Sequence, residues 1–462
     1  MMKLKITSVQ KKLASPSQKN PRVLSLFLLN DFQIKDYHLD TLISEAFDHA
    51  PSFDQRDRSL VFSLVYGVIR WQTHLDFVIQ QFSKTPFSKI ALPISNVLRM
   101  GIFQLLFMNR IPDHAAVNSS VELTRIFAEN YLVRFVNGVL RQTIRSKTSI
   151  QWPDESDTRV DALSVRYAYP GWLIHRWMDQ WGQEKTKAMC IASNTIPKIV
   201  LRSNTLSITR ENLIESLLPS AKEVLPTSHA PDGIWIAQLN EPLDQMESFK
   251  SGGFQVQDEA AQLIGLMVSP KAGESILDAC AGRGGKTGHL AQCMNNQGSI
   301  LAVDQAAHKL ETLSAEMNRL GVSIVKTFQH QWEKPLAPIL FDRILLDAPC
   351  SGLGVIRRHP DMKWKKSKQD IVNNQKQQER LLDTVSTHLK PGGQLIYAVC
   401  SLEPEETIHA VETFLLHHPN FTIETHLDPI LEPFLNHQGY FMACPDEHQM
   451  DGFFAVCFTF NE

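Results

Sequence analysis

The second half of the chain alternates short apolar runs with amphipathic segments, and this rhythm limits the folds open to it. The runs predict buried strands over residues 274–280, 299–304, 341–347 and 394–400. Nearly continuous apolar strands separated by helices predict a doubly wound, Rossmann-like α/β domain with a parallel sheet over residues 251–462. Ligands of such sheets bind at the carboxyl ends of the strands. We therefore expect the functional residues just after these runs.

The rest of the chain predicts two further domains, so we expect a multidomain protein. Apolar residues spaced three and four apart predict an all-α domain over residues 1–150. Residues 151–250 combine a helix that follows Pro170 with short strands that begin at Ile199 and Gly233, which predicts a small α+β domain. A length of 462 residues agrees with three domains.

Charge is distributed unevenly along the chain. Residues 1–150 carry 19 Lys and Arg against 11 Asp and Glu, whereas residues 251–462 carry 17 against 25. A basic arm on an acidic body favours a nucleic-acid partner. A helical domain with surplus surface Arg would give the same balance, so charge alone leaves both interpretations open.

The cysteine spacing and the lengths of the apolar runs indicate in which cellular compartment the protein is expected. The seven cysteines form no Cys-x-x-Cys pair, which argues against a zinc site or a disulfide framework and favours a reducing environment. The apolar run 23–29 is too short to cross a membrane. The basic segment Met1–Lys5 is not followed by the apolar core of a signal peptide. We expect a cytoplasmic protein without a bound metal or a membrane partner.

A glycine-rich turn, residues 282–286, follows the first predicted strand and would let backbone N–H groups approach a ligand. A P-loop would need glycine where Cys280 stands, and a dinucleotide-binding fingerprint would need glycine where Thr287 stands. A nucleoside cofactor without pyrophosphate, such as S-adenosylmethionine, fits better, because Asp304 ends the next predicted strand and can bond ribose hydroxyls. A purely structural turn is the alternative.

Two cysteines follow the last two predicted strands. Cys350 comes directly after Asp347-Ala-Pro, and Cys400 is followed by Ser401. A thiolate that adds to carbon 6 of cytosine makes carbon 5 able to accept a methyl group from a sulfonium. Asp347 stands where an acid can assist the addition. This chemistry does not say which cysteine attacks, and a core position for each is the structural alternative.

These motifs give the chain a family resemblance. The runs Asp347-Ala-Pro-Cys-Ser-Gly and Tyr397-Ala-Val-Cys-Ser resemble the RNA cytosine-C5 methyltransferases of the Nol1/Nop2/Sun superfamily. The resemblance extends to three further segments, 254–263, 354–364 and 451–454. Residues 20–146 resemble the NusB-like RNA-binding domain that is fused to the bacterial members acting on small-subunit ribosomal RNA.

The resemblance implies a role for each site residue. It implies that Cys400 is the nucleophile and that Cys350 assists product release. Lys286 and Asp347 are the other implied catalytic residues. The implied S-adenosylmethionine site consists of Cys280, Ala281, Gly282, Arg283, Gly284, Gly285, Lys286, Asp304, Gln329 and Asp347. The implied substrate is 16S rRNA at cytosine 967, and we expect a monomer.

The chain departs from the family pattern at three positions. Arg283 stands where Pro is usual, Gln329 where Asp is usual, and Val399 where Thr is usual. Arg283 adds positive charge beside a cationic cofactor, and Gln329 can still form hydrogen bonds. We therefore expect altered cofactor affinity and not loss of activity.

A basic segment follows Cys350. Residues 357–368 hold six Lys or Arg, and we expect phosphate contacts and base stacking with single-stranded RNA. The predicted contacts are Arg357, Arg358, His359, Lys363, Trp364 and Lys365. A target cytosine inside a base stack would have to be flipped out. A solvated surface at the start of a helix is the alternative.

Two other functions remain open at this point. One is an RNA-binding assembly factor with a silent catalytic domain, which the departures in the glycine-rich turn favour. The retention of Cys350, Cys400, Asp347 and Lys286 argues against it. The other is methylation of a different RNA, such as tRNA, by the same chemistry.

Overall fold

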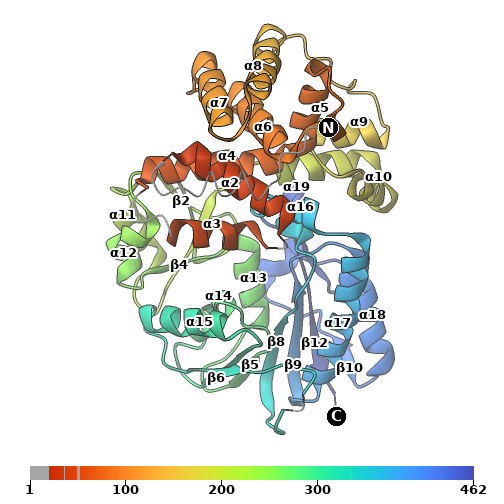
Figure 1. Cartoon of the computed structure of the whole chain (residues 1–462). Helices are drawn as coiled ribbons and strands as arrows, with labels where there is room; N and C mark the ends of the chain where they lie inside the picture. Colours follow the sequence, from red (N-terminus) through yellow and green to blue (C-terminus); the bar gives the residue numbers. More distant parts are fainter. Residues whose placement is uncertain (1–19, 36, 49–52, 335, 462) are drawn as a thin grey trace. The chain divides into compact units, whose positions relative to one another are not determined.

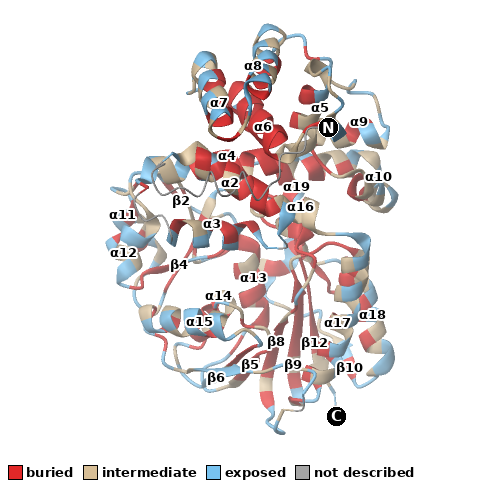
Figure 2. Ribbon diagram, viewed as in Figure 1, coloured by how far each residue is buried: buried red, intermediate tan, exposed pale blue. Residues whose placement is uncertain are grey.

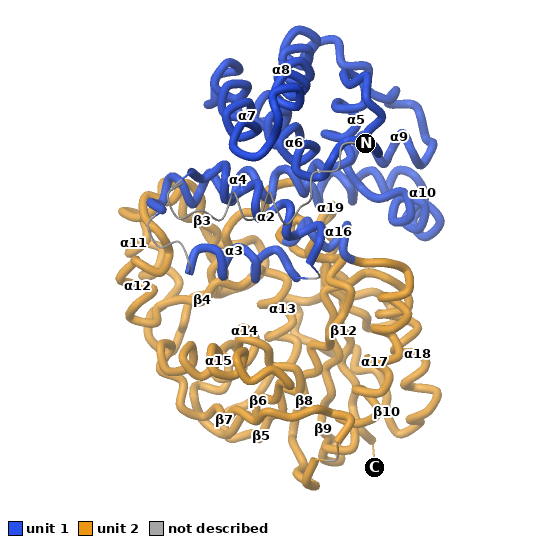
Figure 3. The backbone as a smooth tube through the Cα atoms, in the orientation of Figure 1, with its two compact units in different colours: residues 1–194, 359–365 blue, residues 195–358, 366–462 orange. Residues whose placement is uncertain are grey.

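The computed structural model describes residues 20–35, 37–48, 53–334 and 336–461, so the segment Met1–Lys5 lies outside the described residues. The chain folds into two compact units (Figure 3). Unit 1 comprises Met1–Asn194 and His359–Lys365, and unit 2 comprises Thr195–Arg358 and Lys366–Glu462. No helix within the described stretches is long and apolar enough to cross a membrane.

Unit 1 is helical, as the sequence predicts (Figure 1). Its helices are α2 (Pro21–Ile34), α3 (Leu39–Asp48), α4 (Gln55–Arg70), α5 (Gln72–Phe82), α6 (Leu92–Phe107), α7 (Asp113–Phe127), α8 (Asn130–Arg145), α9 (Val160–Tyr167), α10 (Gly171–Asn194) and α16 (Met362–Lys365).

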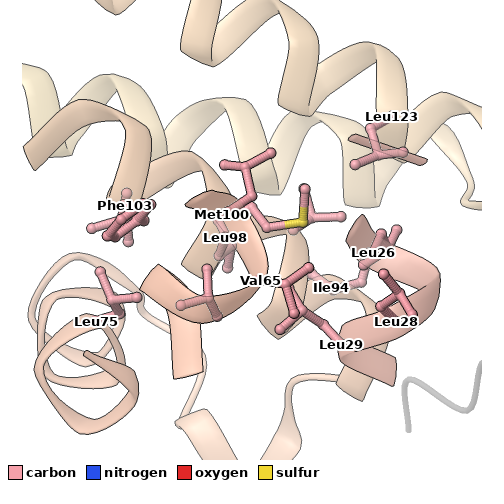
Figure 4. Packing of buried hydrophobic residues seen from close by; sticks show 14 of the residues in the cluster. Leu26, Leu28, Leu29, Val65, Leu75, Ile94, Leu98, Met100, Phe103 and Leu123 are labelled. Carbon is pink, nitrogen blue, oxygen red and sulfur yellow. The ribbon is translucent and has the colours of Figure 1, made fainter. Parts of the chain in front are cut away.

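Helix α6 forms the centre of the core of unit 1. It is buried along nearly its whole length (Figure 2). Gly101 lets α8 approach closely, because a Cβ there would lie 2.8 Å from Leu140 Cδ2. Side chains such as Leu26, Met100 and Phe103 interlock around this helix (Figure 4).

Unit 2 begins with a small antiparallel sheet. Its strands are β1 (Ile199–Ser203), β2 (Ala221–Pro226), β3 (Gly233–Leu239) and β4 (Phe254–Val256), in the order β2-β3-β1-β4. Helices α11 (Arg210–Leu217) and α12 (Glu247–Lys250) accompany them, which gives the predicted α+β character. Strand β4 lies past residue 250, where the sequence places a domain boundary, and it nevertheless pairs with β1.

The second sheet of unit 2 has the order β10-β12-β9-β8-β5-β6-β7, with β11 paired to β12. Its strands are β5 (Ser275–Asp278), β6 (Ser299–Asp304), β7 (Val325–Gln329), β8 (Phe341–Asp347), β9 (Leu389–Val399), β10 (Phe421–Ile423), β11 (Phe441–Ala443) and β12 (Phe453–Phe460). Strands β5 to β9 pair in parallel, as predicted.

Helices cover both faces of this sheet. Apolar side chains of α13 (Glu259–Val268), α14 (Gly285–Cys293) and α15 (Ala307–Arg319) pack on one face. Side chains of α17 (Lys368–Ser386) and α18 (Ile408–His417) pack on the other. The predicted doubly wound, Rossmann-like architecture is therefore confirmed.

One strand corrects the prediction of a fully parallel sheet. Strand β12 runs antiparallel to both β9 and β10, between which it lies. Its residues 453–458 are buried without interruption. A strand covered on both faces has the same continuous apolar pattern in either direction, so the sequence could not reveal its orientation.

Candidate active site

The carboxyl ends of the parallel strands bring the predicted site residues to one edge of the sheet. Strand β6 ends at Asp304, β7 at Gln329 and β8 at Asp347. The pairing register sets Asp304 beside Gln329 and Asp347 beside Ala398 of β9. The structure thus places these residues at the edge where the sequence analysis expects a ligand.

The loop Cys280–Lys286 joins β5 to α14 at this edge. Gly282 and Gly284 have φ angles of 56° and 86°, which glycine adopts without strain. A Cβ on Gly282 or Gly285 would meet no atom within 4 Å. The backbone N–H of Gly282 donates to Asp304 Oδ2 at 3.1 Å. The loop is therefore tied to β6 while its glycine backbone stays open to a ligand.

A pocket adjoins this loop. Its wall includes Cys280, Asp304, Lys309, Trp332 and Pro349. Trp332 Nε1 donates to Ala279 O at 2.8 Å, which fixes the indole in the wall. An aromatic ring together with a carboxylate suits a nucleoside. The sequence analysis missed Trp332, although an aromatic residue three positions after Gln329 was a usable signal.

Of the ten residues of the predicted cofactor site, Cys280 and Asp304 belong to the wall of this pocket and the other eight do not. Ala281 is buried in the apolar cluster on one face of the sheet. Arg283 is exposed. Gln329 is exposed, and its side-chain nitrogen donates to Gln305 O at 3.0 Å. Both Ala281 and Gln329 adjoin the wall in the chain, since Ala281 follows Cys280 and Gln329 precedes His330 of the lining.

Asp278 is a buried carboxyl group at the end of β5. Its Oδ2 accepts a hydrogen bond from Thr287 Oγ1 at 2.7 Å, whereas Oδ1 has no partner among the described residues. Burial raises the pKa of Asp278 to about 7, and the Thr287 hydrogen bond acts in the opposite direction. The site therefore contains an unused acceptor beneath the glycine-rich loop.

The structure joins two of the predicted catalytic residues in an ion pair. Lys286 Nζ lies 2.6 Å from Asp347 Oδ2, and the two side chains are 11% and 31% exposed. The same ammonium lies 4.9 Å from the ring centroid of Phe453. Lys286 thus fixes the carboxylate of Asp347 at the end of β8 and leaves it partly accessible.

The two predicted catalytic thiols are in contact. Cys350 Sγ and Cys400 Sγ are 3.2 Å apart, because they follow the adjacent parallel strands β8 and β9. The pKa of Cys350 is raised, first by the hydrogen bond with Cys400 and then by burial. Either sulfur can be the donor in this contact.

The first two residues of the basic segment are held inside unit 2. Arg357 is 7% exposed, and its Nε donates to Asp451 Oδ1 at 2.6 Å. Arg358 donates to Asp451 Oδ2 at 2.7 Å and to Asp258 Oδ2 at 2.5 Å. Their charges are matched by carboxylates that are distant in sequence. These contacts tie the segment after Cys350 to the start of α13, so they do not support the predicted RNA contacts.

Lys363 corrects the prediction of an RNA contact most clearly. It is fully buried within unit 1. Its ammonium donates to the backbone oxygens of Arg70 at 3.1 Å and Ala168 at 3.0 Å, and to Asn194 Oδ1 at 2.7 Å. An ammonium enclosed by three acceptors cannot reach a phosphate, so its role is structural.

The neighbours of Lys363 are also engaged within unit 1. Trp364 packs against the helical core and donates from Nε1 to Ile69 O at 2.8 Å. Lys365 donates to the backbone oxygen of Lys35. His359 Nδ1 lies 3.2 Å from Asp40 Oδ2. The segment predicted to stack and pair with RNA instead completes the helical unit.

A possible set of metal ligands lies on α19 (Pro445–His448). Within the described part of the chain, ligand atoms of Cys444, Glu447 and His448 lie within 4.8 Å of one another. The backbone N–H of Cys444 donates to His448 Nδ1 at 2.9 Å, which is a local capping contact. Side chains three or four positions apart on a helical turn lie close together, so this proximity does not require a bound ion.

The comparisons with protein families agree with this geometry. Residues 265–459 match the family model described as 16S rRNA methyltransferase RsmB/F. Residues 19–145 match the NusB family. Residues 169–241 match the ferredoxin-like domain described for RsmF/B-like methyltransferases.

Individual relatives extend the match over most of the chain. A probable ribosomal RNA small subunit methyltransferase B from Synechocystis is 32% identical over 94% of this chain and 98% of the relative. A ribosomal RNA small subunit methyltransferase B from Escherichia coli is 34% identical over 78% and 82%. The crystal structure of a methyltransferase homolog from Pyrococcus horikoshii, 28% identical, covers 64% of this chain and 97% of its own with a TM-score of 0.55.

A first prediction concerns Lys363. Replacing it with Met leaves three buried acceptors without a donor, so we expect the free energy of unfolding to fall by about 3 kcal/mol. Urea denaturation followed by circular dichroism measures this change. Lys366→Met, at a partly exposed position of the same segment, serves as the control and should change stability by less than about 0.5 kcal/mol. Unchanged stability with weakened RNA binding would show that Lys363 contacts RNA after all.

A second prediction concerns the pH dependence of stability. The pKa of Asp278 is raised from 3.8 to about 7 in the folded chain. Its contribution is therefore full below pH 3.8 and is lost as the pH rises towards 7. Asp278→Asn keeps an acceptor for Thr287 and removes the charge. We expect it to raise stability at pH 8 by up to about 4 kcal/mol and to leave stability near pH 4 unchanged. Equal melting temperatures of both proteins at pH 8 would contradict the assignment.

Proposed function

Because the chain belongs to the RsmB family of ribosomal RNA small-subunit methyltransferases, we propose that it methylates carbon 5 of a cytosine in 16S rRNA. The proposed position is cytosine 967, and the proposed methyl donor is S-adenosylmethionine. The observation that carries this proposal is the 3.2 Å contact between Cys350 and Cys400 at the strand edge. Methylation of a ring nitrogen or a ribose oxygen needs no thiol nucleophile, whereas methylation of carbon 5 does. Such a substrate suits a cytoplasmic location.

The pocket beside the glycine-rich loop supports this choice of cofactor. When bound, S-adenosylmethionine supplies an electrophilic methyl group on a sulfonium. Asp304 would accept hydrogen bonds from the ribose hydroxyls, and Trp332 offers an aromatic surface to the adenine. The unpartnered Oδ1 of Asp278 suits a donor such as an ammonium group. Gln329 is a further candidate for contact with the adenine.

Cys400 is the proposed nucleophile. The family resemblance implies this role, and its Sγ lies 3.2 Å from Cys350 Sγ at the strand edge. Addition of this sulfur to carbon 6 of cytosine makes carbon 5 enamine-like. Asp347, oriented by Lys286, would act as the acid that supplies a proton to the ring nitrogen as the sulfur adds.

Cys350 is proposed to assist product release. Carbons 5 and 6 of cytosine are bonded neighbours, so a thiol in contact with Cys400 Sγ can also reach the carbon-5 proton. Removal of that proton allows the bond between carbon 6 and Cys400 to break. For this step Cys350 first gives its own proton to water, and the resulting thiolate, a strong base because its pKa is raised, takes the carbon-5 proton.

An exposed basic face on α8 supports RNA as the substrate. Tyr131, Arg134, Arg141 and Arg145 recur on its exposed side, and the helix contains no Asp or Glu. Across the described residues, none of these three arginines pairs with a carboxylate within 4.0 Å. Tyr131 is 47% exposed and available for base stacking. We propose this face, in place of residues 357–365, as the RNA contact of unit 1.

A third prediction tests the reaction. With labelled S-adenosylmethionine and unmodified 16S rRNA, we expect methyl label at cytosine carbon 5 for the wild type and none for Cys400→Ala. Cys350→Ala should instead accumulate a covalent protein–RNA adduct, because release is blocked. The readouts are nucleoside mass spectrometry and denaturing gel electrophoresis. RNA binding without label on 16S rRNA or tRNA would favour the assembly-factor hypothesis.

A fourth prediction tests the α8 face. Arg134→Gln combined with Arg141→Gln should weaken RNA binding for all sequences. It should also lower the slope of log affinity against log salt by about two, since each phosphate contact contributes about one. Fluorescence anisotropy between low and high salt measures the slope. Arg125→Gln on α7, which already pairs with Glu122, is the matched control. An unchanged slope in the double variant would place the RNA elsewhere.

A further inference from the structure

A single buried carboxylate joins the two loops that carry the catalytic thiols. Glu406 ends the short helix η4 (Pro404–Glu406) and is completely buried. Its Oε1 accepts from the backbone N–H of Ser351 at 2.7 Å and from Asn374 Nδ2 at 3.0 Å. Its Oε2 accepts from the hydroxyls of Ser351 and Ser401, each at 2.5 Å. Gln378 Nε2 also donates to Oε1 at 3.5 Å, so five donors converge on one side chain.

The residues held in this way are the direct successors of the two cysteines. Ser351 follows Cys350, and Ser401 follows Cys400. The two serine hydroxyls lie 3.3 Å apart, and the two thiols lie 3.2 Å apart. The thiol contact and the serine contact therefore lie next to each other in the chain. Glu406 joins the two serines, because it accepts a hydrogen bond from each of their hydroxyls.

The charge of Glu406 is not neutralised by a cation. Among the residues that the structure describes, no Lys, Arg or His lies within 4.0 Å of it. Burial of a carboxylate without a cation is costly even when hydrogen bonds satisfy it. If Glu406 only filled space, an apolar or amide side chain would do so at a lower cost in free energy. The buried negative charge therefore indicates a function.

Glu406 is bonded more extensively to the loop of Cys350 than to the loop of Cys400, since it accepts two hydrogen bonds from Ser351 and one from Ser401. Its charge also contributes to the raised pKa of Cys350, after the hydrogen bond with Cys400, burial and the charge interaction with Cys400. The other titratable group packed there is Tyr397 of β9, whose hydroxyl donates to Glu406 O at 2.6 Å. The pair Lys286 and Asp347 lies at the end of β8, three residues before Cys350.

We propose that Glu406 is a positioning residue that keeps the two thiols adjacent and holds their shared proton on Cys350, which leaves Cys400 as the nucleophile. This inference rests on the proposed function, because only that function makes one thiol the nucleophile and the other its partner. The arrangement of Glu406 and the two thiols does not depend on that function. It can be tested through the reactivity of the two thiols in the free protein.

The isosteric variant Glu406→Gln separates charge from shape. Its amide oxygen can still accept from Ser351 N–H and Asn374, and its amide nitrogen can donate to the two serine hydroxyls, which can turn to accept. The fold should therefore persist, as a melting curve will show. Only the negative charge beside Cys350 is lost.

The experiment is alkylation of the two thiols by iodoacetamide as a function of pH, with each cysteine quantified separately by mass spectrometry. In the wild type we expect Cys400 to react at lower pH than Cys350. In Glu406→Gln we expect Cys350 to react about threefold faster at pH 8, which corresponds to a midpoint lower by about half a pH unit. Glu379→Gln, on α17 and without a bond to either serine, should behave as the wild type.

An unchanged Cys350 profile in Glu406→Gln would overturn the proposal, and so would an equal shift in Glu379→Gln. The alkylation needs neither RNA nor cofactor. A protein that shows the predicted shift but transfers no methyl group would therefore leave the role of Glu406 intact and refute only the proposed function.

Discussion

The site depends on the parallel hydrogen bonding between β8 and β9. A shift of one residue between these strands would turn every side chain to the opposite face. The register is fixed because both faces are packed: Leu345 and Ile396 contribute to the apolar cluster on one face, and Leu346 and Tyr397 to the cluster on the other. The contact between the thiols is therefore a consequence of core packing. A chain that buries these strands correctly brings its two cysteines together.

Three acidic groups at this edge lie in three different environments. Asp347 pairs with Lys286 and stays partly accessible. Asp278 has one hydroxyl donor and one unused oxygen, so burial raises its pKa. Glu406 is satisfied by uncharged donors from both thiol loops. These environments match three proposed roles, in which Asp347 meets the substrate, Asp278 offers an acceptor under the loop, and Glu406 holds the thiols.

The sequence predicted which edge of the sheet carries the candidate site residues, because apolar strands and the residues that end them are local features. It failed where partners are distant. Six positive charges in twelve residues indicated a solvated RNA contact, yet Arg357 meets Asp451, which lies 94 positions away. Lys363 is enclosed by unit 1, up to 293 positions away. Glu406 was visible in the sequence, but only the packed structure shows that it faces two serines.

The central claim is that Cys400 attacks the base while Cys350 does not. The most direct test is to incubate the protein and S-adenosylmethionine with 16S rRNA that carries 5-fluorocytidine, whose fluorine blocks the release step. Peptide mass spectrometry of the trapped adduct then identifies the attached residue. The account predicts attachment at Cys400 in the wild type and no adduct in Cys400→Ala. Attachment at Cys350, or tight RNA binding without any adduct, would contradict it.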